Sequence, residues 1–171
     1  MTFVTAGAAL YLAACFLVAA SAKLHDFAEF ATTVEQIAPR LAPRAVARLV
    51  VAAECAVVVS IATGLATGSQ GWIRVGGALA IGCAGLFAGA IGVALRSGRP
   101  VECNCFGGTA DAITSRSFAG PLLIAAAGAI AVLGNGRPEE ASLWIASASA
   151  GAYVLIGHRL LTTGKGAWRS E

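Results

Sequence analysis

Long apolar runs that carry almost no charge are the feature that most constrains this chain. A helix needs about 20 mostly apolar residues to cross the hydrocarbon core of a bilayer. Five segments are candidates, the last of them shorter than the others: 2–22, 49–73, 75–95, 117–136 and 141–157. Only Glu54 interrupts the second segment, and no long polar linker divides the sequence. The pattern predicts an all-α integral membrane protein that forms one membrane domain over 1–171.

The charge content supports lipid as the solvent of this chain. Charged residues make up 12% of the sequence, against about 25% in soluble domains. The net charge of +3 is small and its basic residues are dispersed, which excludes a nucleic-acid partner. The bilayer is therefore the first expected partner.

The basic residues predict an orientation in a bacterial cytoplasmic membrane. With five spans, ten of the 12 Lys and Arg residues fall on one side: Lys23, Arg40, Arg44, Arg48, Arg96, Arg99, Arg116, Arg159, Lys165 and Arg169. The other side carries Arg74 and Arg137. The positive-inside rule places the ten-charge side, and with it the loop that follows the third span, in the cytoplasm.

Two local patterns add detail to this helical plan. Phe27, Phe30, Val34 and Ile37 recur at helical spacing over 25–38, which predicts an amphipathic helix on the membrane surface. Gly82, Gly85 and Gly89 in the third span predict a ridge for close helix packing within the bundle.

The stretch VECNCFGG at 101–108 carries the strongest chemical signal. A disulfide across one intervening residue needs a local turn, which Asn104 and Gly107 favour. Such a bond is strained, and strain makes a disulfide an oxidant rather than a structural link. Cys103 and Cys105 are therefore interpreted as a redox pair. Two alternatives stay open, namely a soft-metal site for Cu(I) or Hg(II) and two incidental thiols at a helix end.

Glu54 and Lys23 are the second candidate group. A carboxylate within a membrane span is a functional hypothesis by default, and Lys23 lies within reach at the foot of the first span. Glu54 is expected either to exchange protons with thiols and a quinone or to form an ion pair that only locks two helices together. Lys23 or Arg99 near the cysteines would favour a thiolate, with Cys105 the better nucleophile because Glu102 adjoins Cys103.

Three further cysteines lie within the predicted spans. Cys15, Cys55 and Cys83 are interpreted first as small apolar core residues and second as candidates for an additional redox thiol. Neither histidine belongs to a ligand-spaced pair, so no structural zinc site is predicted.

Several of these motifs together resemble one family. The VECNCFGG stretch resembles the Cys-x-Cys-Phe-Gly signature of the MauE family of methylamine-utilisation membrane proteins, which are related to the DoxX group. The stretch SAKLHDF at 21–27 is similar to the family's lysine-containing segment, Pro39 to its loop proline and Glu54 to its second-helix glutamate. The likeness extends to about residue 133. After the motif the family has an Arg followed closely by Asn, whereas Arg116 is followed here by SFAG.

The resemblance implies both a fold and an activity. The expected fold is a DoxX-like bundle of four transmembrane helices, to which the segment 141–157 adds a fifth. The expected activity is thiol–disulfide exchange with a thioredoxin-like or other dithiol partner, as in the maturation of methylamine dehydrogenase. Cys103, Cys105, Glu54 and Lys23 would carry the chemistry. The supporting residues would be Asn104, Phe106, Gly107, Arg99 and Arg116.

The electron carrier and the side of the membrane complete the hypothesis. No tightly bound cofactor is expected, and a quinone is the candidate carrier. The family's partner works outside the cytoplasmic membrane, whereas the charge count places the cysteine loop inside. A soft-metal binder and a non-catalytic scaffold subunit remain the alternatives to an oxidoreductase.

Overall fold

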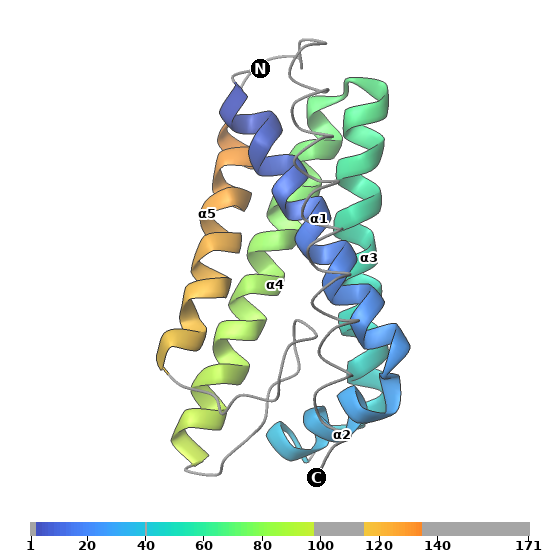
Figure 1. Ribbon diagram of the computed structural model, residues 1–171, viewed down its shortest axis with the longest axis vertical. Coiled ribbons are helices and arrows are strands. Elements are labelled where there is room, and N and C mark those ends of the chain that lie inside the picture. Colours follow the sequence, from blue (N-terminus) through green and yellow to red (C-terminus); the bar gives the residue numbers. More distant parts are fainter. Residues whose placement is uncertain (1–2, 40, 98–114, 135–171) are drawn as a thin grey trace, which may run out of the picture.

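The computed structural model describes residues 3–39, 41–97 and 115–134. Within these residues the chain is entirely helical, with five α-helices and one short 3₁₀ helix (Figure 1). In chain order they are α1 (Phe3–His25), α2 (Phe27–Ile37), α3 (Pro43–Thr67), α4 (Gln70–Ser97), η1 (Ser115–Phe118) and α5 (Ala119–Leu133). The predicted all-helical membrane fold is confirmed.

Three of these helices are long and apolar enough to cross a membrane. They comprise 22 residues (Val4–His25), 25 residues (Pro43–Thr67) and 28 residues (Gln70–Ser97). Helix α5 is apolar but has 15 residues, or about 22 Å at 1.5 Å per residue. The predicted fifth span, 141–157, lies outside the described residues.

The second and third predicted spans, 49–73 and 75–95, are divided at the wrong place. The charged Arg74, which lies between these two predicted ranges, is inside α4. The turn falls instead at Gly68, whose φ of 64° is left-handed and therefore favours glycine. The backbone N–H groups of Gly68 and Ser69 both donate to the carbonyl of Gly64, which ends α3. Arg74 is exposed, and a long charged side chain near the end of a span can be tolerated because it is able to reach the membrane interface.

The four long helices form a bundle in which α1, α3, α4 and α5 pack in that cyclic order. Figure 1 shows α2 at the end of the bundle where α1 finishes and α3 begins. The same end holds the last turn of α4 and the first turn of α5. Helices α1 and α5 lie together near the other end and diverge toward the α2 end.

Glycines allow the closest helix contacts, but not the glycines that the sequence suggested. A Cβ atom on Gly77 of α4 would lie 2.9 Å from the carbonyl oxygen of Gly128 in α5. On Gly76 it would lie 2.5 Å from the side chain of Ile61 in α3. By contrast, Gly82, Gly85 and Gly89 are exposed, and a Cβ on any of them meets no atom of the described residues within 4 Å. The predicted ridge therefore does not pack within this part of the bundle.

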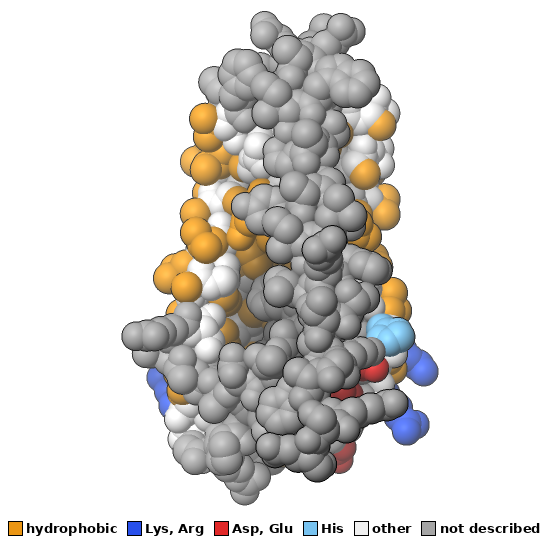
Figure 2. All heavy atoms as spheres, in the orientation of Figure 1, with side chains coloured by type: hydrophobic (Ala, Val, Ile, Leu, Met, Phe, Trp, Pro, Cys, Tyr) orange, Lys and Arg blue, Asp and Glu red, His pale blue; other side chains and the backbone are white. Residues whose placement is uncertain are grey.

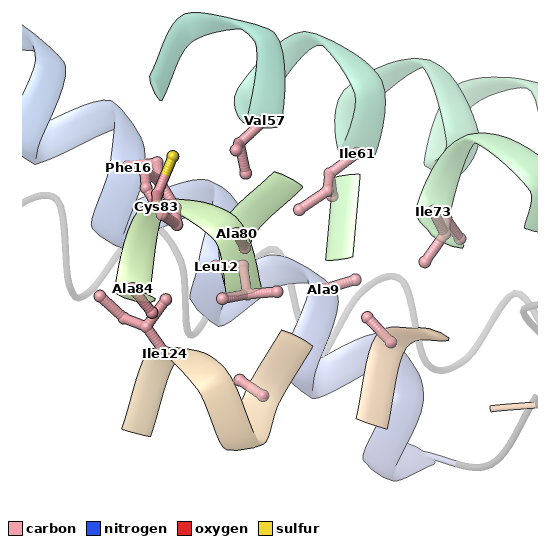
Figure 3. Packing of buried hydrophobic residues seen from close by; sticks show 12 residues of the cluster. Ala9, Leu12, Phe16, Val57, Ile61, Ile73, Ala80, Cys83, Ala84 and Ile124 are labelled. Carbon is pink, nitrogen blue, oxygen red and sulfur yellow. The ribbon is translucent and has the colours of Figure 1, made fainter. Parts of the chain in front are cut away.

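The apolar core lies between all four long helices (Figure 3). Helix α1 contributes Ala9, Leu12 and Phe16, and α3 contributes Val57 and Ile61. Helices α4 and α5 contribute the rest: Ile73, Ala80, Cys83, Ala84, Ile124, Ala127 and Ala131. Many large apolar side chains on the outside are exposed, among them Leu49, Leu86 and Leu133. An apolar exterior around an apolar core is the pattern expected of a bundle that faces lipid.

Helix α2 corresponds to the amphipathic helix expected over 25–38. It runs from Phe27 to Ile37, buries Ala31 against the bundle and exposes Glu29 and Glu35. Figure 2 shows the charged side chains gathered at the α2 end, below a broad apolar band. On the face shown, the described charged side chains thus lie at one end of an apolar band.

Candidate functional site

A buried ion pair joins α1 to α3 near the α2 end of the bundle. The Nζ atom of Lys23 donates to Oε1 of Glu54 at 2.6 Å. Only 1% of the lysine side chain and none of the glutamate side chain is exposed. The sequence predicted that Lys23 reaches Glu54, and the structure brings the two into direct contact.

Helix geometry explains why both side chains point inward. Glu54 falls on the buried face of α3, between Val51 and Val57, with spacings of three residues on each side. Lys23 lies in the last turn of α1, where its long side chain extends between the helices. The cationic side chain also suits a helix C-terminus, where the helix dipole is negative.

Two aromatic rings flank the lysine ammonium group. The centroids of Phe30 in α2 and Phe87 in α4 each lie 5.4 Å from Nζ, within cation–π range. Four helices, α1 to α4, thus meet at this one nitrogen. The lysine is held by a carboxylate on one side and by ring faces on others.

Glu54 uses one of its two oxygens in this arrangement. Oε2 is buried and has no hydrogen-bond partner among the residues that the structure describes. Because a buried acceptor without a donor is unfavourable, this oxygen is open to a proton or to a bound donor. The site therefore combines a fixed cation with a carboxylate that keeps one free position.

Among the three cysteines that the structure describes, Cys83 interacts electrostatically with both residues of the ion pair. It is buried in the core cluster, and its thiol is within Coulombic range of both Glu54 and Lys23. Figure 3 shows its sulfur directed toward α3 beside Phe16. Cys15 and Cys55 are partly buried, and all three are free thiols. Cys55 follows Glu54 directly in the chain, but consecutive side chains of a helix point about 100° apart. The Cys55 side chain therefore leaves α3 in a different direction from that of Glu54.

The remaining predicted site residues fall outside the described part of the chain. They are Arg99, Cys103, Asn104, Cys105, Phe106 and Gly107. Arg116 belongs to η1, but its side chain is not described. The segment that carries the cysteine pair connects Ser97 to Ser115, and both of these residues lie at the α2 end of the bundle (Figure 1).

Sequence reasoning missed the contact of both aromatic rings with Lys23. The sequence pattern assigns Phe30 to an amphipathic face and gives Phe87 no role. The available signal was that Phe87 is the sole aromatic residue from 73 to 97, in a stretch rich in glycine and alanine. Over residues 3–39, 41–97 and 115–134, no three His, Cys, Asp or Glu side chains gather at one point to hold a metal ion.

These features define a class: a small helical membrane protein with a buried lysine–glutamate pair beneath an amphipathic helix. The family model described as methylamine utilisation protein MauE matches residues 1–136, so the chain belongs to the MauE family. The matched region includes every described helix and the cysteine pair, which confirms the resemblance drawn from the motifs. No curated protein and no solved structure matches the chain.

Proposed function

We propose that this protein is a membrane thiol–disulfide oxidoreductase. Cys103 and Cys105 alternate between dithiol and disulfide by exchange with a dithiol of a thioredoxin-like or other protein partner. A quinone-class co-substrate in the membrane exchanges electrons with the same pair. The observation that carries the proposal is the buried Lys23–Glu54 pair, which lies toward the end of the bundle where the cysteine segment begins and ends.

The pair supports a chemical role better than a purely stabilising one. Burying two charges requires removing their water, and this penalty offsets most of their mutual attraction. Replacement of such pairs by apolar residues is often neutral for stability. Ionisable side chains inside membrane spans are therefore a functional hypothesis by default. The free oxygen of Glu54 adds to this reasoning, because a proton acceptor needs an open position.

The chemistry assigned to the residues balances in electrons and protons. When the two cysteines form their disulfide, the dithiol loses two electrons and two protons, and a quinone gains both to become a hydroquinone. Lys23 stabilises the negative charge of a thiolate, which is the nucleophile in disulfide exchange. Glu54 takes up and releases protons as the thiols ionise.

The membrane side of this exchange is part of the proposal. The charge count places the cysteine pair in the cytoplasm, whereas the family's redox partner works outside. Transfer of electrons across the membrane reconciles the two, with Cys83 as the best-placed additional thiol because it is near the ion pair. Cys15 and Cys55 are the other candidates for that role.

The proposal is tested by turnover of a dithiol partner. Full-length protein in lipid, supplied with a quinone, is mixed with reduced thioredoxin, and thioredoxin oxidation is followed by alkylation and gel shift. Cys103→Ser and Cys105→Ser are expected to abolish turnover, while a control at an exposed position without a proposed role, Thr67→Ser, retains it. Turnover at the normal rate in the Cys105→Ser variant would rule the proposal out.

A further inference from the structure

The unused oxygen of Glu54 points to a bound hydrogen-bond donor. Oε1 accepts from Lys23, while Oε2 is buried and meets no donor within residues 3–39, 41–97 and 115–134. The side chain that carries it is completely buried. A charged acceptor in such a position is stabilised by any donor that reaches it.

Charge balance restricts the class of that donor. Lys23 and Glu54 together are neutral, and they lie in an apolar surrounding. A second cation or an anion would leave a net charge buried there, which is strongly unfavourable. The donor is therefore a neutral group such as a hydroxyl.

The surroundings favour an aromatic hydroxyl over a water molecule. A buried water in a protein makes about three hydrogen bonds and needs several polar partners. Here one acceptor is open, and the rings of Phe30 and Phe87 lie against the ammonium that the carboxylate contacts. A ring that carries a hydroxyl satisfies the oxygen and packs its apolar body against aromatic side chains.

We infer that Oε2 of Glu54, together with Phe30 and Phe87, forms the docking site for the hydroxyl of a hydroquinone dissolved in the membrane. This inference rests on the proposed function, in which a quinone-class co-substrate exchanges electrons with the cysteine pair. It assigns the carrier a place in the bundle. Glu54 accepts the hydrogen bond of the reduced carrier at Oε2, while Oε1 keeps its contact with the ammonium of Lys23.

The route to this site passes the two phenylalanines. Lys23 and Glu54 are buried, whereas Phe30 and Phe87 are both partly exposed. Phe30 belongs to α2 and Phe87 to α4, so the two rings mark where α2 borders the bundle. A ligand dissolved in lipid meets these rings before it reaches the carboxylate.

The experiment measures binding rather than turnover. Full-length protein with Cys103→Ser and Cys105→Ser is placed in lipid nanodiscs under anaerobic conditions. It is titrated with decyl-hydroquinone and, separately, with the dimethyl ether of the same compound, which cannot donate a hydrogen bond. We expect the hydroquinone to bind about tenfold or more tightly than its ether, as befits one hydrogen bond to a charged group.

Matched variants locate the binding site. The double variant Lys23→Met/Glu54→Gln carries no buried charge. Its amide oxygen at position 54 is a weaker acceptor than a carboxylate, so the preference for hydroquinone over ether is expected to fall well below that of the parent protein. Phe87→Leu should weaken binding of both compounds, whereas Trp72→Leu, on an exposed position of the same helix, should not. An infrared carboxylate band that shifts on hydroquinone addition, and is absent in a Glu54→Gln protein, would identify the acceptor.

Three outcomes would overturn the inference. These are equal affinity for hydroquinone and ether, full affinity in the double variant, or a carboxylate band that responds to exchange into heavy water but not to hydroquinone. None of them bears on thiol exchange, because the protein tested here lacks the cysteine pair. The proposed function fails separately, on the turnover of thioredoxin by Cys105→Ser.

Discussion

The ammonium nitrogen of Lys23 lies 2.6 Å from Oε1 of Glu54 although 31 positions separate the two residues in the chain. This contact ties the end of α1 to the interior of α3, beneath α2. Its consequences for stability and for chemistry can be separated, because each residue has a neutral replacement of similar shape.

Removing one partner of the ion pair should destabilise the bundle far more than removing both. Lys23→Met or Glu54→Gln alone leaves a buried charge without a counter-charge, which costs about 3–5 kcal/mol. The double variant Lys23→Met/Glu54→Gln should recover most of that loss. Thermal unfolding of the full-length protein in detergent measures all three, with the exposed Arg48→Met as control. If the double variant is as unstable as the two single losses added together, the pair is not coupled as described.

The double variant Lys23→Met/Glu54→Gln should oxidise thioredoxin more slowly while keeping its helical fold. General acid–base catalysis contributes roughly 10²–10⁴-fold to rates, and this protein would have neither the proton acceptor nor the cation. We expect thioredoxin oxidation to slow by at least about tenfold, a conservative limit set below that range. Unchanged helical circular dichroism confirms the fold. Turnover at the normal rate in a folded double variant would reduce the pair to a structural link.

The helices and the ion pair could be predicted from the sequence because each depends on a local or strongly constrained signal. Long apolar runs have few alternatives to spanning a bilayer. Glu54 inside such a run needs a partner, and Lys23 at the foot of the first span lies within its reach. The helix boundary at Gly68 was missed because Arg74 looked like a limit to the apolar run. In the structure a left-handed glycine, not a charge, ends α3.

The glycines of α4 that contact neighbouring helices could not be identified from the sequence. The spacing of glycines along a helix does not fix how that helix is rotated about its own axis. The α4 segment has glycines on several faces, and Gly85 and Gly89 have the four-residue spacing of a packing motif. Which face meets α5 depends on how the whole helix is rotated, and this is set by distributed contacts with α3 and α5. The contact of Phe87 with Lys23 depends on the same rotation.

Adding one methyl group to α4 should therefore distinguish its two glycine faces. Gly77→Ala places a Cβ against the backbone of Gly128 and should destabilise the protein by about 1–3 kcal/mol. Gly85→Ala meets no described atom and should be neutral or stabilising, since alanine favours helix by up to about 1 kcal/mol over glycine. Thermal unfolding of both variants makes the comparison. A greater loss with Gly85→Ala would place an unseen contact on that face.

The two phenylalanines should be energetically coupled to Lys23. Replacing Phe87 by leucine keeps an apolar side chain but removes the ring face, so the lysine loses a cation–π contact of about 0.5–2 kcal/mol. A double-mutant cycle of Phe87→Leu with Lys23→Met should show this coupling, while Phe16→Leu, a core ring without such a contact in the described residues, serves as control. Unfolding measurements that give zero coupling for Phe87 would contradict the arrangement.

The helix ends on either side of the cysteine segment predict which side of the membrane holds the cysteine pair. Because Ser97 and Ser115 both lie at the α2 end, Cys103 and Cys105 should react with a membrane-impermeant maleimide from the side on which α2 lies (Figure 1). Two reporters define the sides in a protein with Cys103→Ser and Cys105→Ser: Ala28→Cys, exposed on α2, and Gly71→Cys, exposed at the start of α4.

In sealed vesicles the native pair should label from the same side as the Ala28→Cys reporter and from the side opposite to Gly71→Cys. Reductant should increase the labelling if the pair is isolated as a disulfide. Cys15, Cys55 and Cys83 should stay unlabelled, since they lie within apolar spans. Labelling of the pair from the Gly71 side would contradict the helix order. Labelling on the cytoplasmic side would agree with the distribution of the basic residues, whereas labelling on the outer side would contradict it.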